Sequence, residues 1–333
     1  MEETKKEIYY IFLGYGGENS LMPLADHLYG KGEKTLVIDD QRYPFTRAEM
    51  LEKLKYIREN FRVVLISSSH VWFDQATYRY FDLVDDPQVL SPLEMLGYLK
   101  PDLSVYYPHD MSEFVHDSEL QFLENFDIVM LPYRNNRYYR IKHIAKRTEV
   151  VGWVKKRQTT APHEHQESTP YTAMFFPSYV PDFYQRLGVD GFADWFRKYI
   201  DKDIHIKMGA GDAGVRPILD KEGYTFLDTS LTVYDAVNTA DLVIGSGTSS
   251  IIFEAALSGI PAVSLLDGNE PDEVIINAVG DIPGVYTLHP DELKPFLADL
   301  NCGKKELVPG LDVLKPFEFD RVQAILADEE NNS

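Results

Sequence analysis

The chain has 333 residues, of which 44% are hydrophobic and 26% charged, a composition typical of globular proteins. This length is too great for one core of typical size, so we expect two domains. Its 53 Asp and Glu against 33 Lys and Arg give a formal net charge of −20, which excludes a broad nucleic-acid-binding face and allows at most peripheral association with membranes. A single cysteine and the lack of any apolar run of about 18 residues exclude an intrachain disulfide and a bilayer span, so we expect a cytoplasmic protein.

Apolar runs that predict strands alternate with helical patterns through the first half of the chain. The predicted helices lie at 21–32, 48–60, 91–99, 118–126 and 135–146. The predicted strands lie at 7–17, 34–40, 62–69, 102–110, 127–132 and 148–154. Such alternation is typical of a parallel sheet with crossover helices, so this half supplies one complete Rossmann-like sheet.

A polar stretch at 156–170, with two prolines and no periodicity, is typical of a linker. Beyond it the predicted strands lie at 172–178, 203–208, 223–228, 241–246 and 262–266. The predicted helices lie at 191–200, 231–240, 251–258, 291–300 and 317–330. We therefore expect an α/β fold of two Rossmann-like domains, residues 1–155 and 171–333, with a ligand cleft between them and a last helix that stays with the second domain or packs back on the first.

The segment DLVIGSGTSSIIFEAALS, residues 241–258, is the candidate anion-binding site. It predicts a buried strand, a glycine turn and a helix, and Gly259 and Pro261 stop that helix. Amides at a helix N-terminus attract phosphate, and Gly247 lets a phosphate approach the backbone. One hydroxyl is enough to cap a helix. The turn carries more than that, at Ser246, Thr248, Ser249 and Ser250.

Helical spacing places Ser250 and Glu254 on one stripe of this helix. Glu254 then lies one turn beyond the anion, where a ribose attached to a phosphate would donate its hydroxyls. A capped core helix with an ordinary exposed glutamate is the alternative interpretation.

The run VYDAVNTADLVIGSGTSSIIFEAALSGIPAVSL resembles the nucleotide-sugar signature of GT-B glycosyltransferases, above all the branch with CDP-glycerol glycerophosphotransferases and UDP-GlcNAc 2-epimerases. In that branch a Ser-Ser turn followed by a helix with an acidic residue binds the donor diphosphate, and Ser249, Ser250 and Glu254 match it. The resemblance also implies donor contacts at Ser178, in the turn after the strand TAMFFPS, and at Lys207, in the strand DIHIKM. Its His-Pro after that strand is replaced here by residues 208–211, MGAG.

Four further residues lie at or just after the ends of predicted strands, where ligands of α/β proteins bind. Asn269 belongs to the run 267–270, DGNE, where relatives of the family read the donor sugar. His109 maps onto the family's Trp-His-Gly histidine, and an imidazole can take the proton of an acceptor hydroxyl. Asp110 stands beside it as a second candidate base. Glu18 follows the glycine turn 14–17, whose spacing does not match a dinucleotide fingerprint and is equally explained by close strand–helix packing.

Three functions remain open at this point. The first is a glycosyltransferase or polyol-phosphate transferase for cell-surface glycan synthesis, which moves a group from a nucleotide-activated donor to a hydroxyl of a glycan, lipid-linked or peptide acceptor. The second is a UDP-sugar epimerase or hydrolase, disfavoured because the family's His-Arg-Arg-Glu-Asn-type run is replaced by residues 177–184, PSYVPDFY. The third is a non-catalytic nucleotide- or glycan-binding relative. The resemblance implies neither a cofactor nor a metal ion.

Overall fold

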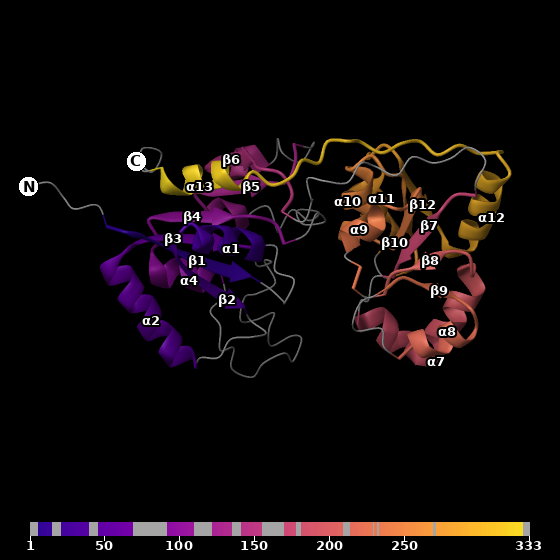
Figure 1. Ribbon diagram of the computed structural model, residues 1–333, viewed down its shortest axis with the longest axis horizontal. Helices are drawn as coiled ribbons and strands as arrows, with labels where there is room; N and C mark the ends of the chain where they lie inside the picture. Colours follow the sequence, from indigo (N-terminus) through magenta and orange to yellow (C-terminus); the bar gives the residue numbers. More distant parts are fainter. Residues whose placement is uncertain are drawn as a thin grey trace, which may run out of the picture. The chain divides into compact units, whose positions relative to one another are not determined.

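The computed structural model describes residues 6–14, 21–39, 46–68, 92–109, 122–134, 141–154, 170–177, 181–208, 214–228, 230–231, 233–268 and 271–328. The chain folds into two compact units. Unit 1 consists of residues 1–156 and 315–333, and unit 2 of residues 157–314 (Figure 1). The end of the chain therefore belongs to unit 1, while the expected linker at 156–170 lies almost wholly outside the described residues.

Unit 1 is built on a six-stranded parallel sheet with the order β2-β1-β3-β4-β5-β6. Its strands are β1 (Ile8–Gly14), β2 (Lys34–Asp39), β3 (Arg62–Ser67), β4 (Leu103–Tyr106), β5 (Ile128–Leu131) and β6 (Arg147–Val150). Among its described residues the helices are α1 (Met22–Gly30), α2 (Arg47–Asn60), α4 (Pro92–Leu99) and α13 (Phe319–Ala327), and residues 141–144, the described end of the helix expected at 135–146, are helical as well. The helix expected at 118–126 is represented among the described residues by a 3-10 turn, Leu123–Asn125.

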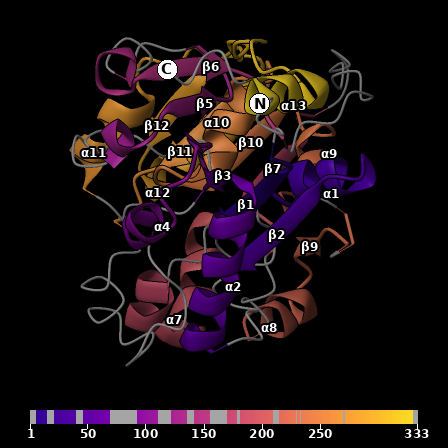
Figure 2. The same ribbon diagram turned by 90° about the vertical axis from the view of Figure 1, so that its left-hand side faces the viewer.

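The helices of unit 1 cover both faces of its sheet (Figure 2). Alternate residues of β1 point to opposite faces, so Ile11 and Leu13 pack with Met50 and Leu54 of α2 on one side. Helices α1 and α13 contact one another and belong to the other side, where Tyr10 points. The capping box of α2, in which Thr46 and Glu49 exchange hydrogen bonds, fixes where that helix begins.

Unit 2 has a second six-stranded parallel sheet, with the order β12-β11-β10-β7-β8-β9. Its strands are β7 (Ala173–Phe176), β8 (His205–Ile206), β9 (Thr225–Phe226), β10 (Leu242–Ser246), β11 (Ala262–Leu265) and β12 (Val285–Leu288). Its helices are α7 (Pro181–Tyr199, kinked at Gly188), α8 (Arg216–Lys221), α9 (Val233–Val237), α10 (Ser250–Ala256), α11 (Asp272–Val279) and α12 (Pro290–Asn301). The two parallel sheets with flanking helices confirm the expected α/β fold class of two Rossmann-like units.

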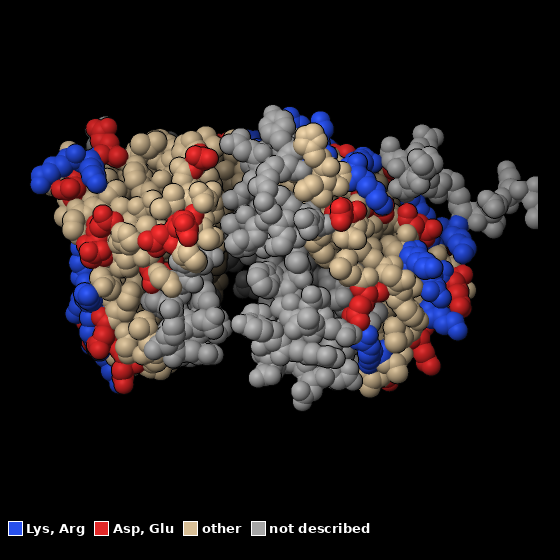
Figure 3. All heavy atoms as spheres, turned by 180° about the vertical axis from the view of Figure 1, so that it is seen from behind, with Lys and Arg blue, Asp and Glu red and all other residues tan. Residues whose placement is uncertain are grey.

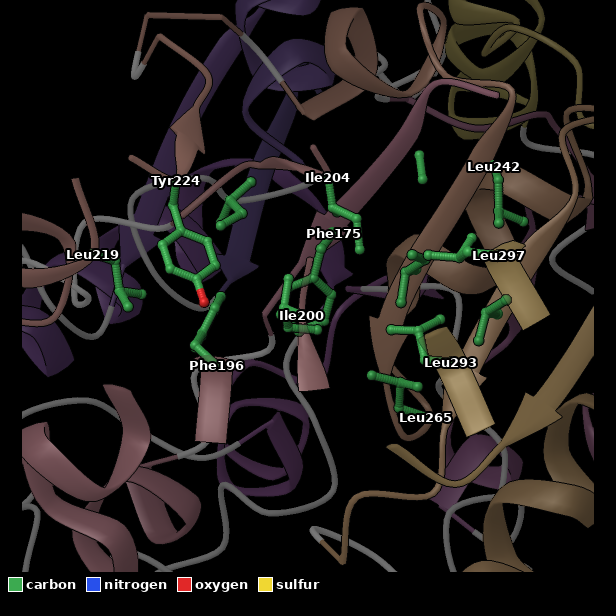
Figure 4. Close-up of a cluster of buried hydrophobic side chains, with 14 of the residues drawn as sticks. Phe175, Phe196, Ile200, Ile204, Leu219, Tyr224, Leu242, Leu265, Leu293 and Leu297 are labelled. Carbon is green, nitrogen blue, oxygen red and sulfur yellow. The ribbon is translucent and has the colours of Figure 1, made fainter. Parts of the chain in front are cut away.

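One face of this second sheet is covered by α7, α8 and α12. Phe175 of β7 packs there against Phe196 of α7, and Leu265 of β11 belongs to the same apolar cluster as Leu293 and Leu297 of α12 (Figure 4). Helix α10 contacts β10 and β11. The sequence analysis does not predict α8, α11 or β12, which have six, eight and four residues, because a short periodic pattern is a weak signal.

Three aspartates brace the amino-terminal edges of the sheets in the same way. Each directly precedes a strand, and its carboxylate accepts a hydrogen bond of 2.7 or 2.8 Å from one backbone amide near the start of the neighbouring strand. They are Asp102 before β4, Asp127 before β5 and Asp241 before β10. Burial opposes ionisation of Asp127, but hydrogen bonds from Lys146 and Ser104 outweigh it and hold the pKa of its carboxyl below the usual value.

The end of the chain completes unit 1. The Trp153 amide donates to the Lys315 carbonyl at 2.8 Å, and the Glu318 amide donates to the Val151 carbonyl at 2.9 Å, so the returning segment pairs with the residues after β6. Arg321 of α13 then donates to the Val150 carbonyl at 2.8 Å. These contacts explain why the last helix stays with unit 1 although its sequence follows unit 2.

Tyr10 provides a test of this core. Its side chain is fully buried, and its hydroxyl has no hydrogen-bond partner within the described part of the chain. Burial, with the Glu33 carboxylate adding to it, raises the pKa of Tyr10 to about 12. Because an unsatisfied buried hydroxyl costs free energy, we expect Tyr10→Phe to raise the free energy of unfolding by about 1 kcal/mol in urea titrations.

Tyr107→Phe is the matched control. The Tyr107 hydroxyl donates to the Gly152 carbonyl at 3.0 Å and accepts from the Val154 amide at 3.1 Å, so its removal should lower stability by about 1–3 kcal/mol. A loss of stability in Tyr10→Phe as large as that in Tyr107→Phe would contradict the prediction.

Candidate functional site

The turn after β10 lies at the point where the strand order of the second sheet reverses. Strands β7, β8 and β9 follow one another to one side, and β10, β11 and β12 to the other, so the boundary between β7 and β10 is the switch point. In open α/β sheets, ligands bind beyond the carboxyl ends of the strands at this position. The topology therefore gives the segment from Gly245 to Ser250 the position in unit 2 where a ligand site is expected.

Two glycines shape this turn for different reasons. A side chain at Gly245 would lie 2.7 Å from the Ile252 Cδ1 atom, so the glycine allows α10 to pack closely on β10. Gly247 has a φ of +51°, in the left-handed region that other residues adopt at a cost. The Gly247 amide donates to the Leu265 carbonyl at 3.0 Å, and its carbonyl accepts from the Ser264 hydroxyl at 2.6 Å. The turn is thus held from the neighbouring strand β11.

Helix α10 begins at Ser250 and ends at Ala256, two residues earlier than expected. Ser249 is its N-cap residue, but the Ser249 side chain makes no capping hydrogen bond. A helix of seven residues has under two turns, so its macrodipole is weak and the amides of the turn have to supply most of any attraction for an anion. The hydroxyl of Ser249 is therefore surplus to the needs of the helix, as the sequence predicts.

Glu254 differs from the exposed residue of the alternative interpretation, because only 4% of it is exposed. The Ser250 hydroxyl donates to its Oε1 atom at 2.8 Å, which puts the two residues on one face, as their spacing predicts. A buried carboxylate is costly without partners, so this hydrogen bond helps to hold it in place. A second hydroxyl–carboxylate pair lies at the start of the turn, where the Ser246 hydroxyl donates to the Asp267 carboxylate.

The hydroxyls of the turn consequently have unequal roles. Ser246 and Ser250 donate their protons to carboxylates, so they are not available as proton donors to a phosphate in this state. Thr248 and Ser249 are half-exposed at the turn itself. The turn thus has two carboxylates that can accept hydrogen bonds and, between them, two half-exposed hydroxyl-bearing residues.

Lys207 lies at the same edge of the sheet, directly after β8, which neighbours β7. It is 9% exposed, and its Nζ atom donates to the Asp228 carbonyl at 3.0 Å. Hydrogen bonds from the Ser230 amide and side chain, together with the charge of Lys207, hold the pKa of the Asp228 carboxyl below its usual value. Lys207 is thus a well-ordered cation near the switch point, two strands from the turn.

In unit 1, His109 follows β4 and is half-buried. The fully buried Tyr107 anchors the backbone just before it, and the Tyr107 ring stacks on Trp153 and meets Phe317 edge-on. His109 thus lies at the carboxyl end of a central strand, where ligand-contacting residues of parallel sheets are found. The other predicted site residues, Glu18, Asp110, Ser178 and Asn269, lie outside the described residues.

Sequence reasoning named Asp267 only as part of the run 267–270, and it missed Ser264 as a contributor to the turn. Asp267 follows an apolar strand, and that position is the signal that singled out the run. Ser264 gives no signal, because a single serine within the apolar strand AVSLL is read as a tolerated core residue. Only the pairing of β10 with β11 brings its hydroxyl to Gly247.

Two negative findings concern the described residues. Among them there is no group of three or more His, Cys, Asp or Glu side chains placed to hold a metal ion. None of the helices within the described ranges has the length and apolarity needed to cross a membrane. On the face shown in Figure 3, acidic and basic side chains of the described residues are interspersed.

No protein-family model matches the chain, and no curated protein matches it in sequence. Among solved structures, it is similar to spinosyn rhamnosyltransferase SpnG complexed with thymidine diphosphate, with 12% identity, a TM-score of 0.49 and coverage of 88% of this chain and 91% of that one. It is also similar to the glycotransferase of kitacinnamycin, with 11% identity, a TM-score of 0.47 and coverage of 90% of this chain and 91% of that one. For a putative UDP-N-acetylglucosamine 2-epimerase from Listeria monocytogenes the identity is 14% and the TM-score 0.47, and the match covers 91% of this chain and 89% of that one.

The chain's own topology defines its class: a protein of two Rossmann-like units, the second with a glycine turn at its switch point. This is the two-unit α/β fold that the resemblance to GT-B enzymes implies.

Gly247→Ala tests the geometry of the turn. A side chain at a φ of +51° is strained, so we expect the free energy of unfolding to fall by about 1 kcal/mol in urea titrations. Gly97→Ala is the control, since Gly97 lies inside α4 with open space around it and alanine favours helix by up to about 1 kcal/mol. Equal stability of the two variants would contradict this account of Gly247.

Proposed function

We propose that the chain is a glycosyltransferase, or a polyol-phosphate transferase, that moves a group from a nucleoside-diphosphate-activated donor to a hydroxyl acceptor. The observation that carries the proposal is the turn from Ser246 to Ser250 at the switch point of unit 2, with the buried, hydrogen-bonded Glu254 one helical turn beyond it. Packing requires the apolar residues of α10, but it requires neither the surplus hydroxyls nor a buried carboxylate.

The diphosphate is assigned to the middle of the turn. The chain carries a net charge of −20, so its long-range field repels a dianion, and binding has to come from short-range donors. The Thr248 amide and the Ser249 hydroxyl are the proposed donors, and Gly247 allows a close approach. Lys207 and Ser178 are the proposed additional donor contacts.

The hydroxyl groups of the donor are assigned to the carboxylates. Glu254, positioned by Ser250, accepts from the ribose hydroxyls. Asp267, which already accepts from Ser246, and Asn269 face the transferred group in this proposal. A carboxylate binds hydroxyl groups well because it offers only acceptors, and the buried position of Glu254 strengthens each hydrogen bond.

The acceptor chemistry is assigned to unit 1, with His109 as the base, Asp110 as its alternative or its orienting partner, and Glu18 as a further contact. For a sugar donor, the base takes the proton of the acceptor hydroxyl while the acceptor oxygen bonds to the anomeric carbon. The bond from that carbon to the diphosphate breaks, and the nucleoside diphosphate leaves with the bonding electrons. Donors in the turn that stabilise this leaving group make catalysis largely electrostatic and positional.

Ligand-dependent stability tests the donor site. In a thermal-shift panel of UDP, CDP, GDP, ADP, CMP and their sugar conjugates, we expect the ligands of one base to stabilise the folded chain. The free energy of unfolding should rise by about 2.7 kcal/mol at a ligand concentration 100 times the dissociation constant. Stabilisation by none of them would reject both the transferase and the alternative of an epimerase or hydrolase. Binding without turnover of any conjugate would favour the non-catalytic alternative.

Glu254→Gln sharpens this test. We expect it to weaken the preferred ribonucleotide about tenfold or more, because a charged hydrogen bond is lost, and to leave binding of the 2′,3′-dideoxy analogue unchanged. Glu273→Gln, a change at an exposed residue of α11 in the same unit, is the control and should affect neither ligand. Equal weakening of both nucleotides would show that Glu254 does not contact the ribose.

The role of His109 is tested by turnover. His109→Ala should reduce release of nucleoside diphosphate from the donor about 10²- to 10⁴-fold while donor affinity stays unchanged, as expected when a general base is removed. His143→Ala is the control, because His143 is an exposed histidine of the same unit. Full turnover in His109→Ala would refute the assignment.

A further inference from the structure

Ser264 is a buried polar residue for which the proposed donor contacts have no use. It lies in the middle of β11 between Val263 and Leu265 and is 0% exposed. A hydroxyl in such a place is costly unless it is hydrogen-bonded, and an alanine would fill the same place in an apolar strand. The hydroxyl donates to the Gly247 carbonyl at 2.6 Å, which is the backbone of the turn itself.

This hydrogen bond fixes the orientation of one peptide group. A trans peptide is planar, and its carbonyl and amide point in opposite directions. Since the Gly247 carbonyl points to Ser264 in the buried strand, the Thr248 amide of the same peptide group points away from that strand. The preceding peptide group is fixed as well, because the Gly247 amide donates to the Leu265 carbonyl at 3.0 Å.

The anchoring matters because it acts at a glycine. Glycine occupies left- and right-handed conformations with similar ease, so the peptide groups beside Gly247 have little intrinsic preference for one direction. Two hydrogen bonds with β11, one donated by Ser264 and one accepted by Leu265, hold Gly247 in a single conformation with a φ of +51°. Thr248 to Ser250 are half-exposed beyond the buried Gly247.

We infer that Ser264 is a positioning residue for the donor site: through the Gly247 carbonyl, it sets the direction in which the turn offers the Thr248 amide to the donor's diphosphate. The inference rests on the proposed function. Ser264 itself touches no substrate. Its contribution is preorganisation, so that the turn does not have to be ordered when the nucleotide binds.

Ser264→Ala, compared with Ser104→Ala, tests this role. Ser104 is a matched control, because it is a buried strand serine of unit 1 whose hydroxyl also donates over 2.6 Å, to Asp127. Isothermal titration calorimetry uses the nucleoside diphosphate that stabilises the wild-type chain most in the panel of UDP, CDP, GDP and ADP. We expect Ser264→Ala to raise its dissociation constant about tenfold, the effect of one hydrogen bond of ordinary strength, and Ser104→Ala to leave it unchanged.

Ser264→Thr separates positioning from stability. It keeps the hydroxyl but adds a methyl group to a tight core, so it should lose stability and still bind the nucleotide within about twofold of wild type. Amide hydrogen exchange gives a second readout, with faster exchange of the Thr248 amide in Ser264→Ala than in Ser264→Thr.

The outcomes distinguish the inference from the proposed function. If the wild type binds a nucleoside diphosphate and Ser264→Ala binds it as tightly, the positioning role is wrong and the donor site stands. A threonine variant that binds as weakly as the alanine variant also overturns it. If the wild type binds none of the four, the proposed function fails, and the role of Ser264 fails with it.

Discussion

The parallel pairing of β10 with β7 on one side and β11 on the other is the constraint on which the candidate site depends. Parallel strands must end at the same edge, so this pairing brings the residues after three strands together. It also places β10 at the reversal of strand order, where neighbouring connections lead away to opposite sides. The turn at Gly247 is therefore both at the position where ligands bind and within reach of β11, which holds its backbone.

The polar groups of this turn are of two kinds, hydrogen-bond acceptors and hydrogen-bond donors. Ser246 and Ser250 donate to Asp267 and to the buried Glu254, so a carboxylate lies beside each end of the turn. Between them lie the Thr248 amide and the Ser249 hydroxyl, which are the proposed donors to the diphosphate. A donor with a diphosphate between two hydroxyl-bearing groups, a ribose and a sugar or polyol, has the complementary order. This match of polarity supports the proposed substrate class without requiring a cluster of cations in an acidic protein.

Much of the fold was predictable, because periodicity reports local burial. The runs at 7–17, 62–69 and 241–246 are apolar over the length of a strand, and each forms a central strand of its sheet. Short edge elements were not predictable. β12 is half-buried along its whole length and α8 has only six residues, so neither carries a clear periodic pattern of apolar residues. The placement of α13 depends on backbone pairing with residues after β6, which leaves no mark in its own sequence.

The sequence by itself determined the α/β class, the order of elements, the glycine turn and the i, i+4 spacing of Ser250 and Glu254, because these follow from neighbours along the chain. The tertiary structure alone decided that Glu254 is buried, that Ser246 pairs with Asp267 and that Ser264 anchors Gly247. Each of these contacts joins residues of different strands or depends on what packs over a helix. Hydrogen bonds between residues 17 or 21 positions apart arise from sheet register, and register is set by the packing of the whole unit.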